Sequence, residues 1–232
     1  MLTRYLNRLF ERRDLSPLEM EEALRIVTGG EVAHSQIGAF LAALRMKGVS
    51  RSELVGAARM LRRAAAFIDC GRREVVDVVG TGGDGSNSFN ISTASAFAAA
   101  GAGVTVAKHG NRAASSRCGS ADVLAALGYN LEAPVPVIEH EIVENGIGFL
   151  YAAKLHPALA NVAVIRRELK VRTIFNMLGP LCNPAGAKSI VLGVYAPELT
   201  ELFAGALLEL GVRRALVVHG MEGIDEISCC GP

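Results

Sequence analysis

The spacing of apolar residues changes near residue 74, and this change constrains the fold more than any other feature of the chain. Before it, apolar side chains such as Leu2 and Leu6 recur every three or four residues, which is typical of amphipathic helices. After it, short β-branched runs such as Val75–Val79 alternate with helical stretches. Such alternation favours crossover connections and a largely parallel sheet. The sequence therefore predicts an α/β protein with a small helical domain, residues 1–73, and a larger α/β domain, residues 74–232.

Helix start signals subdivide the first domain. Ser16, followed by Pro17 and then by Glu19, is typical of the first residues of a helix, and so is Ser50 with Glu53. Helices are expected there over about residues 2–10, 17–28, 35–48 and 51–61. In the second domain, strands are expected over residues 75–79, 104–107, 147–151, 190–195 and 215–218, and helices over 93–100, 121–127, 137–144, 157–169 and 197–210.

Composition excludes several classes of protein. Half of the residues are apolar and a fifth are charged, which rules out a disordered chain. The net charge of +1 gives no general attraction to nucleic acid or to an anionic membrane, although residues 1–73 hold 13 Lys or Arg against 8 Asp or Glu. The five cysteines show neither a disulfide framework nor zinc-ligand spacing, which suits a reducing cytosol. No apolar run reaches the ~18 residues of a membrane span, and the N-terminus lacks an apolar signal core.

A glycine-rich segment, Gly80–Thr93, follows the first predicted strand and leads into a helix. In open parallel sheets, ligands bind beyond the carboxyl ends of the strands, and a helix N-terminus favours a phosphate there. Asn90 and Ser92 add a side-chain donor and a hydroxyl that can reach a metal ion. An ordinary turn with a helix cap explains such a short glycine motif about equally well, and the segment is neither a dinucleotide fingerprint nor a P-loop.

A second segment, Lys108–Ser120, also lies between a predicted strand and a predicted helix. Its three cations and small polar residues suit an anion with many oxygens, and Lys108 and Arg112 can neutralise charge on a departing phosphate group. The alternative is a solvated basic loop, which is less favoured because both segments follow successive strands. His109 is either a proton donor or a residue that shapes the loop, and the second role is preferred.

Two further segments carry weaker signals. Asp225 and Glu226 follow the last predicted strand and suit Mg²⁺, although an adjacent acidic pair is usually a solvated surface. Arg166 and Arg167 lie near the end of a predicted helix, ahead of the segment FNMLGPLCNPA. An arginine can bind a carboxylate through two hydrogen bonds, but a double arginine at a helix end is more often solvent-exposed.

Taken together, GTGGDGSNSFNIST, KHGNRAASSRCGSADVLAALG, FNMLGPLCNPA and HGMEGIDEIS closely resemble the anthranilate phosphoribosyltransferase family, in its order and spacing over essentially the whole chain. The resemblance implies a helical domain, joined by a later helical stretch of about residues 157–186, that is hinged to an α/β domain and forms a cytoplasmic homodimer. It implies Mg²⁺-dependent transfer of phosphoribose from phosphoribosyl pyrophosphate (PRPP) to the amine of anthranilate, in tryptophan biosynthesis. Neither nucleic acid nor a membrane is an expected partner.

The resemblance also implies roles for individual residues. PRPP is expected to contact Gly80, Gly83, Asp84, Ser88, Asn90, Ile91, Ser92, Thr93, Lys108, His109, Gly110, Asn111, Arg112, Ala113, Ala114, Ser115, Ser116 and Ser120. Two Mg²⁺ ions are expected at Ser92, Asp225 and Glu226, and anthranilate at Gly80, Asn111 and Arg166. The catalytic residues are expected to be Lys108 and Arg112, which stabilise the leaving oxygens, and His109, which shapes the anthranilate pocket or relays a proton.

Three alternative functions remain open at this point. A pyrimidine nucleoside phosphorylase shares the fold and a glycine-rich phosphate loop, but its second loop has Lys followed by Ser-Gly-Arg. A nucleic-acid-binding paralogue without catalysis would have no need of the Asp225–Glu226 carboxylates. The third alternative is an inactive or incomplete member, because members of the family usually continue beyond the Asp-Glu segment with further strands and helices. The α/β domain is accordingly expected to lack its C-terminal part.

Overall fold

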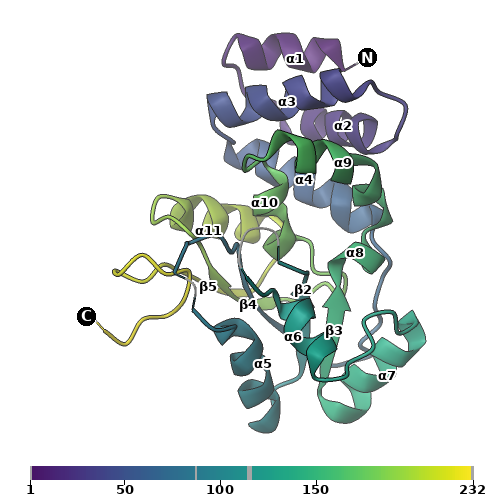
Figure 1. The fold of residues 1–232 in the computed structure, drawn as a ribbon, viewed down its shortest axis with the longest axis vertical. Helices are drawn as coiled ribbons and strands as arrows, with labels where there is room; N and C mark the ends of the chain where they lie inside the picture. The colour runs from purple at the N-terminus through teal and green to yellow at the C-terminus, as the bar shows by residue number, and fades with distance from the viewer. Residues whose placement is uncertain (1, 87, 114–116, 231–232) are drawn as a thin grey trace. The chain divides into compact units, whose positions relative to one another are not determined.

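The computed structural model describes residues 2–86, 88–113 and 117–230. Their contacts divide the chain into two compact units, Met1–Ala65 with His156–Cys182 and Ala66–Leu155 with Asn183–Pro232. The first is helical, and the second contains a sheet covered by helices (Figure 1). Within the described residues, no helix has the length and apolar character that crossing a membrane requires.

The helical unit is built from α1 (Thr3–Phe10), α2 (Pro17–Thr28), α3 (His34–Lys47), α4 (Arg51–Ala64), the 3₁₀ turns η1 (Pro157–Leu159) and η2 (Gly179–Leu181), α9 (Ala160–Leu169) and α10 (Phe175–Leu178). Both expected capping boxes are present, at Ser16 and Ser50. Glu53 is fully buried, and its carboxylate accepts the Leu15 amide at 3.0 Å, the Ser50 amide at 2.8 Å and Lys47 Nζ at 2.9 Å. These bonds satisfy a buried charge and join the starts of α2 and α4.

The α/β unit contains β1 (Val76–Gly80), α5 (Ile91–Gly101), β2 (Val106–Gly110), α6 (Ser120–Ala126), α7 (Val135–Asn145), β3 (Ile147–Tyr151), α8 (Ala152–Leu155), β4 (Ser189–Gly193), α11 (Leu199–Glu209) and β5 (Arg214–Val218). Its five strands are ordered β3-β2-β1-β4-β5, and every neighbouring pair is parallel. The predicted class, a helical domain with a largely parallel α/β domain, is confirmed.

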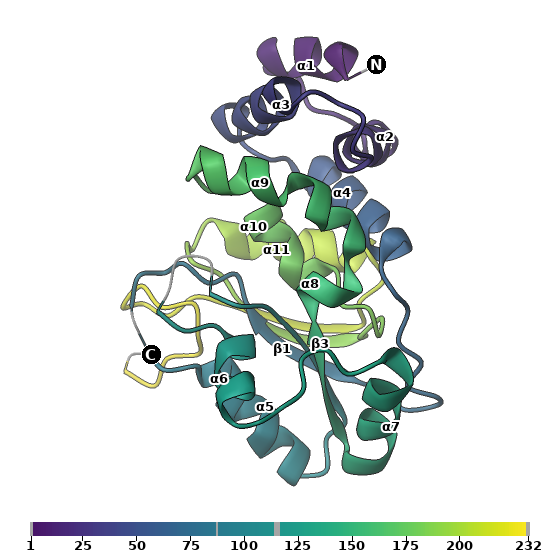
Figure 2. The ribbon, with the colours of Figure 1, turned by 45° about the vertical axis from the view of Figure 1, so that its right-hand side comes forward.

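The strand order places a topological switch point between β1 and β4. From β1 the chain proceeds through β2 to β3 on one side, whereas β4 and β5 extend the sheet on the other. Helices α5, α6 and α7 cover one face and α11 covers the opposite face (Figures 1 and 2). Because the connections leave β1 and β4 toward opposite faces, the ligand-binding crevice of such a sheet lies at their carboxyl ends. Two glycines, Gly80 and Gly193, are paired there.

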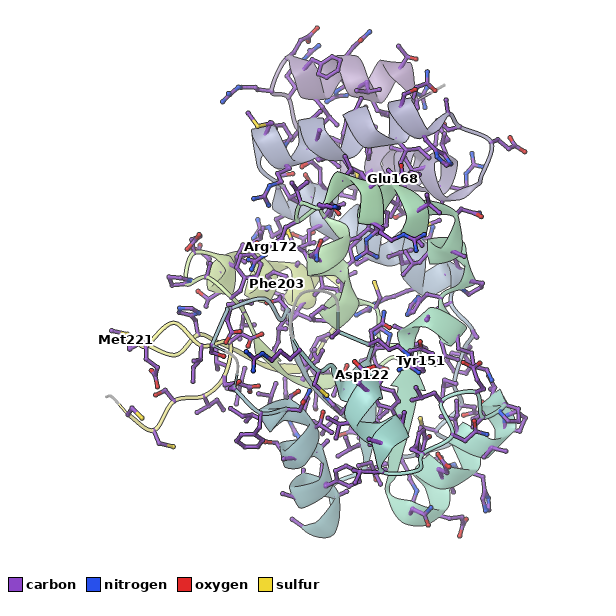
Figure 3. The ribbon with its side chains drawn as sticks, viewed as in Figure 1. Asp122, Tyr151, Glu168, Arg172, Phe203 and Met221 are labelled. Atoms are coloured by element: carbon purple, nitrogen blue, oxygen red, sulfur yellow. The ribbon has the colours of Figure 1, made fainter. Side chains whose placement is uncertain are left out.

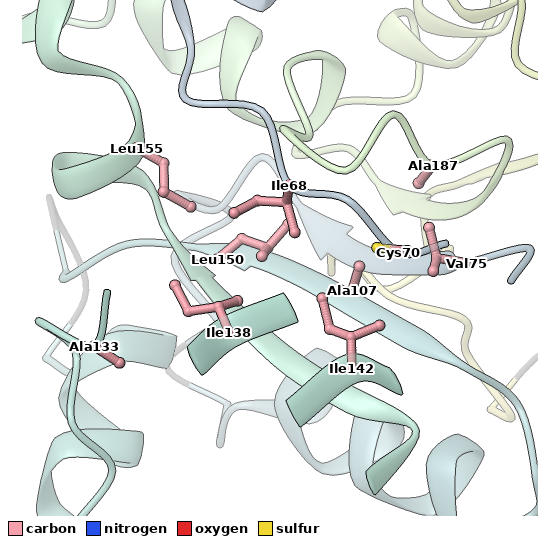
Figure 4. Packing of buried hydrophobic residues seen from close by; sticks show 10 residues of the cluster. All are labelled: Ile68, Cys70, Val75, Ala107, Ala133, Ile138, Ile142, Leu150, Leu155 and Ala187. Atoms are coloured by element: carbon pink, nitrogen blue, oxygen red, sulfur yellow. The ribbon is translucent and has the colours of Figure 1, made fainter. Parts of the chain in front are cut away.

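One buried cluster packs α7 against two strands of this sheet. It joins Ile138 and Ile142 of α7 to Ala107 of β2 and Leu150 of β3, together with Ile68 from the preceding segment (Figure 4). All five side chains are at most 2 % exposed, so each contributes roughly the full burial energy of its apolar surface. This core therefore holds α7 and the segment before β1 against β2 and β3.

The second strand differs from its predicted position. The apolar pattern predicts a strand over residues 104–107, followed by a polar loop, whereas β2 spans Val106–Gly110. Lys108 and His109 are therefore buried strand residues, 4 % and 3 % exposed, and not loop residues. A strand continues through such residues when each polar group has a buried partner, which local sequence does not reveal.

Candidate active site

Lys108 lies at the centre of the candidate site, on β2. Its ammonium donates to Val78 O of β1 at 2.6 Å and to Ser92 Oγ of α5 at 3.2 Å. Burial lowers the pKa of Lys108 to about 8, and the negative charges of Asp77 and Glu226 oppose that shift. The lysine is thus a buried cation held at the carboxyl edge of the sheet, facing the first turn of α5.

Glu226 joins the same cluster from a distant part of the sequence. The Ser92 amide donates to its carboxylate, and Lys108 attracts it. Burial and the charge of Asp225 nevertheless raise the pKa of Glu226 to about 7. Ser92, Lys108 and Glu226 therefore meet at one place, where the amino end of α5 favours anions.

Asp225 lies directly over the carboxyl ends of β1 and β4. Its Oδ2 accepts the Gly82 amide at 2.8 Å, and its own amide donates to Asp84 Oδ2 at 3.4 Å. Burial raises the pKa of Asp225, with a further contribution from the charge of Asp84. The structure thus brings the glycine-rich segment and the acidic pair together.

These carboxylates suit a hard divalent cation. The charge of Asp84 raises the proton affinity of Asp225, and the charges of Asp84 and Asp225 raise that of Glu226, because these carboxylates lie close together in a partly desolvated place. Over residues 2–86, 88–113 and 117–230, no group of three or more His, Cys, Asp or Glu side chains is arranged to enclose a metal ion. An open site fits Mg²⁺, which is commonly held by one or two carboxylates together with substrate phosphates.

Asp77 and Asn183 hydrogen-bond to the main chain of β2 beside Lys108. Neither of them was identified from the sequence as a site residue. Asp77 is fully buried, and its carboxylate accepts the His109 amide at 3.0 Å and Asn183 Nδ2 at 2.8 Å. Asn183 also donates to Ala107 O at 2.8 Å. Burial raises the pKa of Asp77 to about 6, and Lys108 opposes that shift. The one sequence signal was a charged residue inside an otherwise apolar strand.

The segment after β2 is organised by Asp122, a third residue that sequence reasoning missed. Its carboxylate accepts the amides of Ala113 and Gly119, each at 2.9 Å, and forms an ion pair with Arg112 at 2.8 Å. Arg112 also hydrogen-bonds the Tyr151 side chain; Asp122 and Tyr151 can be followed in Figure 3. Arg112 is exposed, so its guanidinium remains accessible to an anion.

The remaining PRPP residues gather around the same two segments. Asn90 Nδ2 donates to Cys118 O at 3.3 Å, which links the first segment to the second. Asn111 O accepts the Ala121 amide at 3.1 Å and the Ser120 hydroxyl at 3.3 Å. Gly83, Ser88, Ile91, Thr93 and Gly110 lie in or beside these segments. Ala114, Ser115 and Ser116 lie outside the described residues.

His109 and Arg166 are placed differently from the rest. His109 is 3 % exposed and follows Lys108 in the strand, so the two side chains leave opposite faces of the sheet. Arg166 belongs to the helical unit, near the end of α9, where its guanidinium lies 5.2 Å from the centre of the Phe175 ring. Burial lowers the pKa of Arg166. A guanidinium held against an aromatic ring keeps the planar donors that suit a carboxylate.

Comparison with known families matches both parts of the chain. Residues 3–65 match the helical bundle domain of a glycosyl transferase family, and residues 72–232 match the α/β domain of that family. A curated relative, anthranilate phosphoribosyltransferase from Syntrophobacter fumaroxidans, is 56% identical over 227 residues, which cover 98% of this chain and 67% of the relative. The chain thus spans about two thirds of the length of the curated relatives it matches.

Solved structures agree with this match. Anthranilate phosphoribosyltransferase from Thermus thermophilus superposes with a TM-score of 0.90 at 49% identity, covering 96% of this chain and 67% of that one. The Saccharomyces cerevisiae enzyme in complex with PRPP and Mg superposes with a TM-score of 0.92 at 30% identity, covering 99% and 68%. With both domain families matched, and with relatives identical at more than half of the aligned positions, the chain belongs to the anthranilate phosphoribosyltransferase family.

Proposed function

We propose that this chain transfers phosphoribose from PRPP to the amine of anthranilate and releases pyrophosphate. The observation that carries the proposal is the meeting of Lys108, Ser92 and Glu226, with Asp225 beside them, at the carboxyl edge of the sheet. A polyphosphate needs cations and N–H donors there, and a hard cation needs carboxylates. Both sets are present within one cluster.

PRPP is held by the two polar segments in this proposal. The glycine-rich segment after β1 contains Gly82, Gly83 and Gly85, all with positive φ, so its backbone turns sharply, and the Gly82 amide donates to Asp225 at the carboxyl edge. The amino end of α5 adds partial positive charge. Asn111 and Arg112 approach from the second segment and add side-chain donors.

In the reaction, the bond between the anomeric carbon and the pyrophosphate oxygen breaks, and its electron pair leaves with pyrophosphate. The nitrogen lone pair of anthranilate forms the new bond to that carbon, and the nitrogen then loses a proton. Lys108 and Arg112 donate hydrogen bonds to the leaving oxygens, which lowers the barrier most if their positions are set in advance. The arylamine is neutral near pH 7, so positioning supplies much of the acceleration and no strong base is required.

Mg²⁺ belongs to the proposal as well. Ser92, Asp225 and Glu226 would hold it, and two ions are expected with PRPP bound. When bound, the ions neutralise charge on the phosphate oxygens. The residues of this chain contribute by holding the carboxylates in place, through the Gly82 and Ser92 amides.

Arg166 is proposed to bind the carboxylate of anthranilate, with Gly80 and Asn111 on the same substrate. The stacking of Arg166 on Phe175 limits the rotamers of a long side chain, which reduces the entropy lost on binding. His109 is proposed to shape this pocket or to relay the proton lost from nitrogen.

A homodimer through the helical unit completes the proposal. Two large apolar side chains on this unit, Phe10 of α1 and Met46 of α3, are 65% and 75% exposed. Exposed apolar side chains are typical of interaction surfaces when they are contiguous. Sedimentation of the purified chain at several concentrations tests this point independently of activity.

The activity itself is tested by the decrease in anthranilate fluorescence when the purified chain is mixed with PRPP and Mg²⁺. The expected result is turnover that requires both PRPP and Mg²⁺. Thymidine or uridine with inorganic phosphate forms the second arm, because a pyrimidine nucleoside phosphorylase would consume them. A folded protein that consumes nucleoside and leaves anthranilate unchanged would contradict the proposal.

A further inference from the structure

Gly193, the last residue of β4, lies beneath the main chain of Asp225. A Cβ atom added to Gly193 would lie 1.5 Å from the Asp225 carbonyl oxygen and 2.5 Å from the carbonyl carbon. Its partner across the sheet, Gly80, has a similar relation to the carboxylate, because a Cβ there would lie 2.6 Å from Asp225 Oδ2. Contacts under 3.0 Å essentially never occur for a Cβ, so any side chain at Gly193 must displace one of the two segments.

The need for glycine at position 193 is one of space and not of backbone conformation. Gly193 is absent from the positive-φ glycines of the described chain, and it continues the regular β4–β1 register. An alanine could therefore adopt its backbone angles without strain. What an alanine could not do is leave room for Asp225.

The end of β4 is hydrogen-bonded to both neighbouring strands of the sheet. Gly193 O accepts the Thr81 amide at 2.9 Å on the β1 side, and the following Val194 amide donates to Val218 O at 2.9 Å on the β5 side. The segment above is instead a turn, closed by Gly220 donating to Ile224 O at 2.8 Å. A clash would therefore be relieved by movement of Asp225.

We propose that Gly193 is a positioning residue for the carboxylates of Asp225 and Glu226. Together with Gly80 it forms a side-chain-free surface at the switch point, here called the seat, on which Asp225 lies. The role in binding Mg²⁺ and PRPP rests on the proposed function. The seat itself rests on the geometry of β1, β4 and Asp225. Displacing Asp225 breaks its bond to the Gly82 amide and moves the adjacent Glu226 away from Ser92.

The test compares Gly193→Ala with Gly101→Ala, whose added Cβ meets nothing within 4 Å and whose backbone is equally ordinary. Two measurements are made on the folded chain: hydrogen exchange over residues 219–228, and titration calorimetry of PRPP with Mg²⁺. Gly193→Ala is expected to speed exchange in that segment and to weaken binding by about tenfold or more, as is typical when a group that orients metal ligands is lost. Gly101→Ala is expected to match the original chain in both.

A double-mutant comparison separates positioning from a general loss of structure. If Gly193 acts through the two carboxylates, Gly193→Ala adds little further loss of binding once Asp225→Asn and Glu226→Gln are present. The proposal would be overturned if the losses of binding free energy in Gly193→Ala and in the carboxylate variant were fully additive. It would also be overturned if Gly193→Ala left the hydrogen-exchange rates of residues 219–228 unchanged. If the original chain fails to bind PRPP with Mg²⁺, the proposed function is wrong. The comparison of hydrogen exchange between Gly193→Ala and the original chain still tests whether Gly193 positions Asp225. If Gly193→Ala does not fold, Gly80→Ala tests the same seat through faster exchange of the Gly82 amide.

Discussion

Replacing Lys108 with methionine tests the centre of the site. The substitution keeps most of the buried aliphatic stem and removes the ammonium. Two of the three N–H groups donate to Val78 O and Ser92 Oγ, so within the described part of the chain the third is left to reach a leaving phosphate oxygen. Lys108 is only 4 % exposed, and its hydrogen bonds hold the ammonium in place before substrate arrives. A hydrogen-bond donor stabilises developing negative charge most strongly when it is desolvated and positioned in advance.

The size of the effect follows from this arrangement. Loss of one preorganised donor to a developing negative charge raises the barrier by ~3–4 kcal/mol, so Lys108→Met is expected to lower kcat by ~10²–10³. Lys108→Arg keeps the charge but is not expected to restore the rate, because a planar guanidinium does not reproduce the hydrogen bonds of a compact ammonium to Val78 O and Ser92 Oγ. The matched control is Lys188→Met, an exposed lysine just before β4, which should leave kcat unchanged.

The assay is steady-state loss of anthranilate fluorescence at saturating PRPP and Mg²⁺, with circular dichroism to verify folding. Folding needs this check because Lys108→Met leaves Asp77 buried without its neighbouring positive charge. A folded Lys108→Met protein whose kcat falls by less than about fivefold would show that the lysine is structural, since a lost catalytic donor has a much larger effect.

Three further outcomes are expected. Arg166→Ala should raise the KM for anthranilate far more than that for PRPP, and equal effects in steady-state kinetics would refute its role as the carboxylate binder. Asp225→Asn combined with Glu226→Gln should shift the Mg²⁺ titration of turnover to higher concentration, and an unchanged curve would exclude the metal role. Burial lowers the pKa of His156 to about 4. Below about pH 6.5 the unfolded chain therefore binds a proton at this histidine that the folded chain does not bind. The free energy of unfolding should consequently fall by roughly 3 kcal/mol by about pH 4. His156→Gln should flatten that loss in urea titrations, and an unaltered pH dependence would contradict the assignment.

Sequence patterns predicted the elements whose apolar periodicity is strong. The capping boxes at Ser16 and Ser50, the parallel strands and the polar segments after β1 and β2 all follow from local signals. The short α10 and η2 lie within the helical stretch that the family resemblance implies, but apolar periodicity did not predict them, because the segment FNMLGPL is rich in turn-forming residues and too short to show a helical period. Local reasoning therefore succeeds where burial is periodic.

The buried polar contacts of the site could not be predicted in this way. Asp77 meets Asn183 across 106 residues of sequence, and Gly82 meets Asp225 across 143. No local pattern encodes such pairs, so Lys108 was expected in a loop when it lies in a strand. For the same reason Asn183 and Gly193 showed no signal of their own, since their roles exist only once β1 and β4 are paired.

The charges of the cluster imply how substrate and metal depend on each other. Lys108 is balanced in part by buried Asp77, which leaves the carboxylates of Asp84, Asp225 and Glu226 as excess negative charge near the carboxyl edge. A polyphosphate brought there alone would be repelled by these carboxylates, and the carboxylates alone offer Mg²⁺ only part of the oxygens it prefers. Each ligand therefore supplies what the other lacks. It follows that the protein contributes to binding mainly by holding these negative charges close together before either ligand arrives. A rigid sheet edge with glycine at positions 80 and 193 can hold them in this way.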